Sequence, residues 1–256
     1  MEIITSIKSV KDWKRVYPPV GKDKQWKDGY SAKEFAKIVL DAYPNSNFEQ
    51  DIANDLHLKE HLHIIPDETY PERLTNFDDN YRGPRHHDLA CITMIGNQRV
   101  ALCFEAKVNE SLDNTLLKYR DSEGKKKRVD LLISNFFHEK YSDSKFGNIY
   151  YQLFSALAGY IAFAAENNVS DVYFILYQIK PSETNQTVNC DEHKTALEDF
   201  ITLFGSRVSK PNENIYDLGT LTIERHFDDD PSKAKMNANV KIAYIEKTVS
   251  GKKVKE

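Results

Sequence analysis

Two apolar runs, residues 89–95 and 100–108, flank the dipeptide Gly96-Asn97. A two-residue loop that begins with glycine is typical of a type II′ turn between antiparallel strands. Such a turn fixes the strand register, because Ile95 then faces Gln98 and each step back along the first strand is matched by one step along the second. The sequence therefore predicts a β-hairpin with a defined pairing.

The predicted register brings charged residues together. Asp88 falls directly opposite Glu105, where opposed Cβ atoms lie about 4.5–5.5 Å apart, and Lys107 shares the face of Glu105 because side chains alternate along a strand. Two adjacent carboxylates repel each other unless a divalent cation lies between them. Oxygen ligands favour Mg²⁺ or Mn²⁺ over zinc. We therefore predict that Asp88 and Glu105 bind a metal ion and that Lys107 activates water or stabilises phosphoryl charge.

A plain structural interpretation competes with this one. The hairpin could be a buried strand pair that carries one acid and a solvated Glu-Ala-Lys segment by chance, because short motifs produce false positives. Charges without partners are costly inside a strand. Here three charged residues share one face with Ala90, Ile92 and Ala101. That arrangement favours a functional site.

Asp88 followed by Glu105-Ala106-Lys107 on the next strand resembles the motif of the PD-(D/E)xK nuclease superfamily, which has the restriction endonuclease-like fold. The segments GYSAKEFAK (residues 29–37) and YYQLFSALAGYIAF (150–163) look like the flanking helices of an uncharacterised bacterial branch of that superfamily. His87 stands where the motif has proline. The resemblance implies a three-layer α/β/α sandwich around a mixed central β-sheet.

The resemblance also implies an activity. It points to a Mg²⁺-dependent nuclease, in which Mn²⁺ can substitute, that hydrolyses phosphodiester bonds of DNA as a restriction or defence-type endonuclease. DNA is then the expected partner, and a homodimer is compatible with the family. One alternative is a catalytically inactive protein of this fold that binds nucleic acid or a protein partner. Another is a metal-dependent hydrolase of a small phosphorylated molecule, which a narrow closed pocket would favour.

Two further catalytic candidates come from the resemblance. A glutamate on the helix before the hairpin often joins the metal site, and Glu34 is the matching residue. Ser31 and Glu34 also have capping-box spacing, in which the glutamate bonds back to the start of its helix. Gln152 matches a glutamine on the equivalent helix of some superfamily nucleases. Its spacing to Tyr160 is not the four residues that those nucleases use, so a structural role is the alternative.

Basic residues near the motif are candidates for nucleic-acid contacts. Arg85 and His86 directly precede the motif, and the register places His86 opposite Lys107, where it could contact a phosphate or shape the pocket. A second group of basic residues follows the hairpin and could bind the DNA backbone or simply form a charged surface. It comprises Lys125, Lys126, Lys127 and Arg128.

Composition limits the other function classes. The 256-residue chain is 40% hydrophobic and 29% charged, which is ordinary for a globular protein. Its net charge of −4 argues against a surface of uniformly positive potential. No apolar run approaches the roughly 20 residues of a membrane helix, and the N-terminus has no signal-peptide core, so we expect a cytoplasmic protein without a membrane partner. Three cysteines predict neither a disulfide scaffold nor a zinc ribbon.

The remaining patterns predict how the chain is organised. A lead-in segment (residues 1–28) precedes a nuclease-like core (29–205) and a C-terminal β-hairpin (206–250) that packs on the core or extends it. Apolar periodicity predicts helices at residues 31–43, 48–58, 150–166 and 191–204. Strands are predicted at 171–180, 215–226 and 238–248. This order of elements fits an α/β sandwich.

Overall fold

The computed structural model describes residues 7–19, 22–24, 26–41, 47–78, 83–181, 190–224 and 235–249. The helices within these ranges are α1 (Val10–Val16), η1 (Lys22–Lys24), α2 (Ser31–Val39), α3 (Phe48–Asp55), α4 (Leu116–Tyr119), α5 (Glu123–Phe137), α6 (Asp143–Phe146), α7 (Tyr151–Glu166), α8 (Cys190–Thr202) and η2 (Gly205–Arg207). The strands are β1 (Leu62–Thr75), β2 (Arg85–Ile95), β3 (Gln98–Lys107), β4 (Asp171–Pro181), β5 (Ser209–Asn212), β6 (Ile215–Glu224) and β7 (Lys235–Val249).

These strands form one seven-stranded sheet in the order β1-β2-β3-β4-β7-β6-β5. The pairs β1–β2 and β2–β3 are antiparallel, whereas β4 runs parallel to β3 and β7 runs parallel to β4. The last pairs, β7–β6 and β6–β5, are antiparallel again. The sheet is therefore mixed, and the C-terminal strands extend it through β7, which lies beside β4 and not at an edge.

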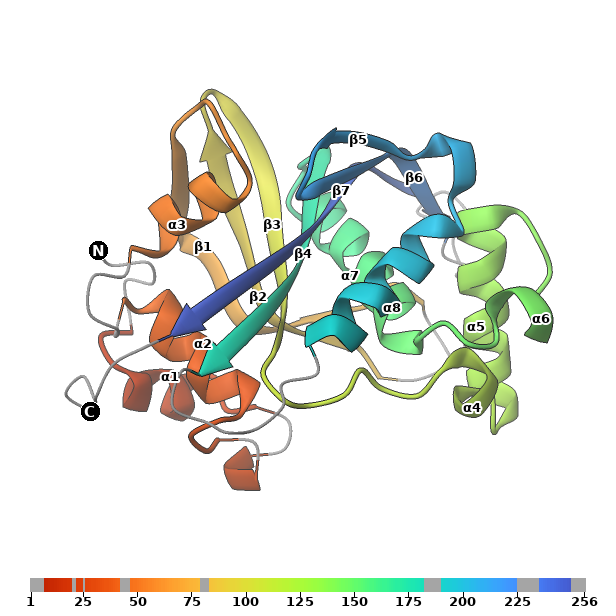
Figure 1. Ribbon diagram of the computed structural model, residues 1–256, viewed down its shortest axis with the longest axis horizontal. Helices are drawn as coiled ribbons and strands as arrows, with labels where there is room; N and C mark the ends of the chain where they lie inside the picture. Colours follow the sequence, from red (N-terminus) through yellow and green to blue (C-terminus); the bar gives the residue numbers. More distant parts are fainter. Residues whose placement is uncertain are drawn as a thin grey trace.

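Helices cover both faces of the sheet (Figure 1). One hydrophobic core contains Trp13 of α1, Phe35 of α2 and Phe48 of α3, packed against one face of the sheet. A second, larger core contains residues of α5, α7 and α8 against the other face. These two cores confirm the predicted three-layer α/β/α sandwich.

Helix α7 is the central element of the larger core. Every residue from Leu153 to Ala164 is buried, as expected for a helix that is apolar on all sides. It packs across the sheet, touching strands from β1 to β6. Its first turn carries Gln152, so packing of the apolar body fixes the position of that side chain next to β3.

The predicted hairpin is confirmed in type and register. Gly96 has a φ of 58°, whereas Asn97 is not among the described residues with positive φ, as a type II′ turn requires. The pairing runs from Ile95 opposite Gln98 to Leu89 opposite Phe104, as the turn predicts. The predicted helices are also present, although the first ends at residue 39 and not at 43.

Strand β1 departs from the sequence prediction. The sequence patterns predict no strand before the hairpin, but β1 spans Leu62–Thr75 and pairs with β2 over most of its length. It contains Pro66 and Pro71. Proline has no backbone N–H to donate, and an edge strand tolerates it because only one side of the strand pairs with a neighbour. Its register shifts between Ile64 and Thr69.

A close contact between α7 and β2 gives a stability prediction. A Cβ atom added to Gly159 would lie 2.5 Å and 2.8 Å from two ring atoms of buried His87. Replacing glycine with alanine in the middle of an ordinary helix stabilises that helix by roughly 0.5–1 kcal/mol. For Gly159→Ala we instead expect the free energy of unfolding to fall by about 1–3 kcal/mol because the added methyl group overpacks the contact. Urea unfolding measures this change. If Gly159→Ala is more stable than wild type, the close contact between Gly159 and His87 is contradicted.

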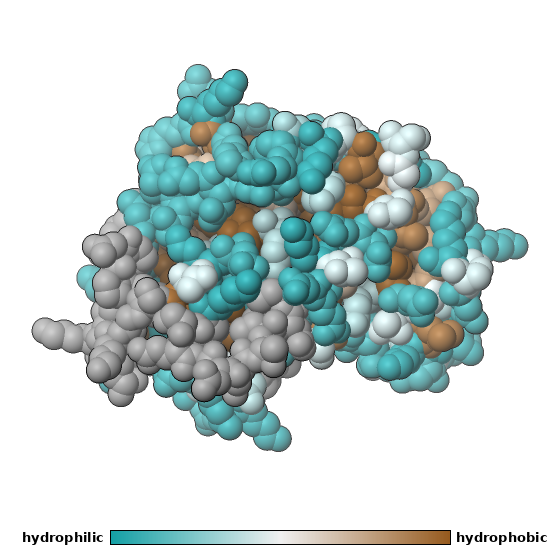
Figure 2. Space-filling view, in the orientation of Figure 1, coloured by the Kyte–Doolittle hydropathy of each residue, from teal (hydrophilic) through white to brown (hydrophobic). Residues whose placement is uncertain are grey.

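Hydrophilic residues make up most of the described surface in the face shown in Figure 2, with hydrophobic residues in smaller patches between them. Within the described residues, no helix combines the length and apolar character needed to cross a membrane.

Candidate active site

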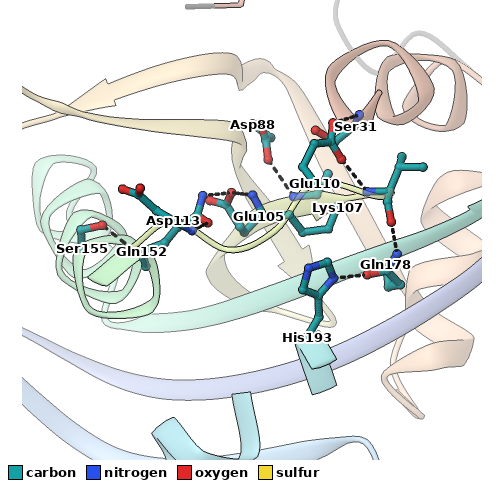
Figure 3. A network of polar contacts seen from close by, with 12 residues as sticks. Ser31, Asp88, Glu105, Lys107, Glu110, Asp113, Gln152, Ser155, Gln178 and His193 are labelled. Carbon is teal, nitrogen blue, oxygen red and sulfur yellow. Dashed lines mark hydrogen bonds and ion pairs between the residues drawn. The ribbon is translucent and has the colours of Figure 1, made fainter. Parts of the chain in front are cut away.

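The strands of the hairpin separate at Asp88. Regular β2–β3 pairing ends at Leu89 opposite Phe104. Beyond it, Oδ2 of Asp88 accepts a hydrogen bond from the Ala106 amide at 2.7 Å, so a carboxylate replaces a main-chain carbonyl as the partner of β3 (Figure 3). This bond holds the Asp88 carboxylate beside the Glu105-Ala106-Lys107 segment.

Glu105 has three polar partners in the site. Its Oε2 pairs with the Arg85 guanidinium. Its Oε1 lies 3.0 Å from the Lys107 ammonium and accepts a 2.6 Å hydrogen bond from Nε2 of Gln152. Burial opposes ionisation, but the charges of Arg85 and Lys107 outweigh it and lower the pKa of Glu105. Glu105 is therefore a buried carboxylate ringed by donors.

The structure brings most of the predicted site residues into one pocket. The pocket has a volume of about 430 Å³. Residues of β1, β2, β3 and α7 line it together, including Glu72, Arg85, His86, Asp88, Glu105, Lys107 and Gln152. The oxygen of the Gln152 side chain also accepts a hydrogen bond from the Asp113 amide at 3.3 Å. Gln152 thus reaches the site, although its separation from Tyr160 is not the four residues found in the nucleases that the sequence resembles.

Glu72 is a site residue that the sequence reasoning missed. Its neighbours in β1 pair with Leu89 and His87, so Glu72 lies across from Asp88. It adopts a φ of 50°, a conformation that is strained for a residue with a side chain. Burial and the charges of Asp88 and Glu105 raise its pKa to about 9. No turn signal links β1 to β2, so the local sequence could not reveal this register.

A second set of polar contacts lies behind Lys107. Gln178, opposite Lys107 in the β3–β4 pairing, donates from Nε2 to the Val108 carbonyl at 2.8 Å. Its side-chain oxygen lies 2.6 Å from Nδ1 of His193, so that nitrogen carries the proton. Burial and the charge of Lys107 lower the pKa of His193. These buried amide and imidazole groups fix the end of β3 (Figure 3). They were also missed, because they come from distant strands and helices.

Glu34 does not line the pocket. Its carboxylate accepts a 2.9 Å hydrogen bond from the Gly29 amide and pairs with Lys37 at 3.0 Å. Glu34 therefore bonds back to the start of α2, as in the capping interpretation, although the amide is that of Gly29. Glu110 instead reaches the pocket, and its carboxylate accepts hydrogen bonds from the amides of Ser31 and Val108 at 2.7 Å and 3.0 Å.

The basic run forms the first turns of α5 and does not line the pocket. Lys125 pairs with Asp121 at 2.7 Å, and Lys126 and Lys127 are exposed. Arg128 differs from its neighbours, because it is buried and bonds to Asp78 and to the Gly83 carbonyl. The guanidinium of Arg128 is therefore engaged within the core, and its contact with DNA stays a prediction.

The oxygen atoms present fit a hard cation. One oxygen of Asp88 holds the Ala106 amide, and among the described residues the other oxygen has no hydrogen-bond partner. Within the same ranges no three acidic, histidine or cysteine side chains converge as a complete metal cluster. Mg²⁺ does not require one, because proteins commonly hold it with one or two carboxylates, water and substrate phosphate. Asp88 and Glu105 could supply those carboxylates.

The site makes stability depend on pH. Burial and the charge of Glu105 raise the pKa of Asp88 to about 7. The folded protein then binds protons that unfolded carboxyl groups, with pKa values of about 4, release. The free energy of unfolding should therefore fall as pH rises through this range. Histidines with lowered pKa values act in the opposite sense, but only below about 6.5. They are His86, His87 and His193.

We accordingly expect the melting temperature in EDTA to fall between about pH 6.5 and pH 8. Millimolar Mg²⁺ should reduce the fall, because a cation stabilises the ionised carboxylates. A Glu72→Gln variant, which removes the carboxyl group whose pKa is raised to about 9, should show a shallower slope of melting temperature against pH. Melting curves that do not change with pH in EDTA would show that Asp88 and Glu72 have ordinary pKa values.

Comparison with known proteins identifies the family of this chain. No curated protein and no solved structure matches the chain. A family model described as Domain of unknown function (DUF6946) matches residues 6–250, which is nearly the whole chain. The protein therefore belongs to the family with that description.

Proposed function

We propose that the protein is a Mg²⁺-dependent nuclease that hydrolyses phosphodiester bonds of DNA, of the PD-(D/E)xK, restriction endonuclease-like type. The observation that carries the proposal is the meeting of Asp88, Glu105 and Lys107 in one pocket at the point where β2 and β3 separate. The α/β/α architecture with a mixed sheet is compatible with it.

Each residue has a distinct part in the proposed reaction. Bound Mg²⁺ would polarise a phosphoryl oxygen and favour ionisation of water. Asp88 and Glu105 would hold the ion. Lys107, held 3.0 Å from Glu105, would orient the attacking water and stabilise the charge that builds on the phosphoryl group. Gln152 positions Glu105 through its 2.6 Å hydrogen bond.

Plasmid cleavage tests the proposal. We expect the purified protein to nick or linearise plasmid DNA with Mg²⁺ or Mn²⁺ and to be inactive in EDTA. Asp88→Asn should be inactive under all conditions. Asp171→Asn makes the same substitution at a half-buried position outside the pocket and should cleave normally. If wild type and Asp88→Asn cleave equally, the site is not responsible for the activity.

A specific observation favours a second candidate, a nuclease-fold protein that binds nucleic acid or a protein partner without cutting. Both oxygens of Glu105 already have partners within the protein, so the site is neutralised internally. This candidate predicts no metal-dependent cleavage and tolerance of Glu105→Gln. Salt-sensitive binding to DNA would identify the nucleic-acid version.

The pocket volume allows a third outcome to be tested in the same assay. About 430 Å³ lies within the range of small-ligand sites. A small phosphodiester such as bis(p-nitrophenyl) phosphate should be cleaved far more slowly than plasmid if DNA is the substrate. Faster cleavage of the small ester would favour a hydrolase of small phosphorylated molecules.

A further inference from the structure

The ion pair between Arg85 and Glu105 has a consequence for metal binding. The two side chains are only 16% and 5% exposed, so water screens their charges weakly. The guanidinium occupies Oε2 of Glu105, while Lys107 and Gln152 occupy Oε1. Glu105 therefore satisfies its charge without a metal ion.

A divalent ion and Arg85 cannot both lie against the same carboxylate oxygen. Both are positive, and like charges a few ångströms apart in a poorly solvated site repel strongly. Arg85 is also an incomplete partner in this arrangement. Its buried Nε has no hydrogen-bond partner among the described residues, and only Nη2 reaches Glu105. A single-ended pair of this kind is weaker than the bidentate form.

The stem of Arg85 is held in place by α7. A Cβ atom at Gly159 would lie 3.0 Å from Cγ of Arg85, so the absence of a side chain there lets the stem pass close to the helix. Arg85 also lines the pocket together with Asp88 and Lys107. A released guanidinium would therefore remain within the pocket that the substrate phosphate enters.

Resting on the proposed function, we infer that Arg85 occupies the place of the divalent ion in the metal-free protein and competes with the ion for Glu105. Ion binding frees the guanidinium, which then binds a phosphate oxygen of the substrate. Arg85 thus couples metal binding to substrate binding. It lowers the affinity of the empty site for metal and strengthens phosphate binding once the metal is present.

Mn²⁺ titration followed by electron paramagnetic resonance tests this inference without measuring activity. Arg85→Gln keeps a polar side chain and removes the charge, so we expect it to bind Mn²⁺ roughly tenfold more tightly than wild type. Arg99→Gln is the matched control, because Arg99 is an exposed residue of β3 that pairs with Glu68 at 2.9 Å. It removes the same charge and should change the affinity by less than about twofold.

The outcomes separate the inference from the proposed function. If wild type binds Mn²⁺, Asp88→Asn does not, and Arg85→Gln binds no more tightly than wild type, the inference is overturned and the nuclease proposal stands. If only Arg85→Gln binds Mn²⁺, the inference holds and the wild-type protein is not a metal-dependent nuclease. Absence of binding in every variant overturns both.

A measurement on the wild-type protein covers the case in which Arg85→Gln does not fold. The Nε–H signal of Arg85 in a ¹⁵N spectrum should shift when Mg²⁺ is added, because the guanidinium leaves Glu105. The Arg99 signal should not shift. If wild type binds Mg²⁺ while the Arg85 signal stays unchanged, the guanidinium has not moved and the inference is overturned.

Discussion

Replacing Lys107 with methionine is expected to lower the rate of Mg²⁺-dependent plasmid cleavage by about 10²- to 10⁴-fold. The ammonium lies 3.0 Å from Glu105 and is almost fully buried, so no solvent cation takes its place easily. Methionine has a similar length and no charge, so it tests the charge more than the packing. Initial rates at saturating DNA measure the effect on turnover, and Mn²⁺ titration shows whether the ion still binds.

Lys180→Met is the matched control for Lys107→Met. Lys180 lies on the neighbouring strand β4, pairs with Glu246 at 2.6 Å and does not line the pocket. Its loss should leave the cleavage rate within about twofold of wild type, as expected for a surface ion pair. Wild-type cleavage by Lys107→Met would remove Lys107 from the chemistry.

Local sequence was sufficient where a short segment determines its own geometry. Gly96 permits the positive φ of a type II′ turn, and that one turn fixed the pairing as far as Leu89 opposite Phe104. The apolar body of α7 likewise identified a buried helix, since few other elements contain so long an apolar segment. The metal-site prediction followed from the same turn, and Asp88 and Glu105 do line one pocket.

Local sequence was insufficient where partners come from distant segments. The alternation of side chains between the two faces of the sheet changes phase in β2. The ring of His87 packs against Tyr160 of α7, and Ala90, three residues later, belongs to the core on the same side. Strict alternation along β2 therefore could not predict that the Asp88 carboxylate accepts a hydrogen bond from the Ala106 amide of β3. Glu72 depended on a β1–β2 pairing without a short turn. The position of β7 beside β4 is a parallel contact between residues far apart in the chain.

Charge runs are ambiguous for a related reason. Lys125, Lys126 and Lys127 are indistinguishable from Arg128 in the sequence, yet helix α5 turns Arg128 toward the core. Its guanidinium bonds to both oxygens of buried Asp78 and lies 4.7 Å from the centre of the Phe77 ring. A guanidinium suits such a site because its planar donors can bind a carboxylate with two bonds.

This burial predicts a large loss of stability for Arg128→Met. Removing one member of a buried ion pair leaves the other charge without compensation, which costs about 3–5 kcal/mol. Urea unfolding followed by circular dichroism measures the loss. Lys127→Met, one residue earlier on the exposed side of α5, should change the free energy of unfolding by no more than about 0.5 kcal/mol.

A double variant separates the uncompensated charge from lost packing. Asp78→Asn combined with Arg128→Met removes both charges, so it should be more stable than Arg128→Met alone because no carboxylate remains buried without a partner. A loss below about 1 kcal/mol for Arg128→Met would place the guanidinium in solvent and restore it as a candidate DNA contact. A loss of the expected size would keep Arg128 in the core. If the salt dependence of DNA binding is also unchanged in Lys127→Met, the basic residues of the pocket remain the groups available to bind a phosphate.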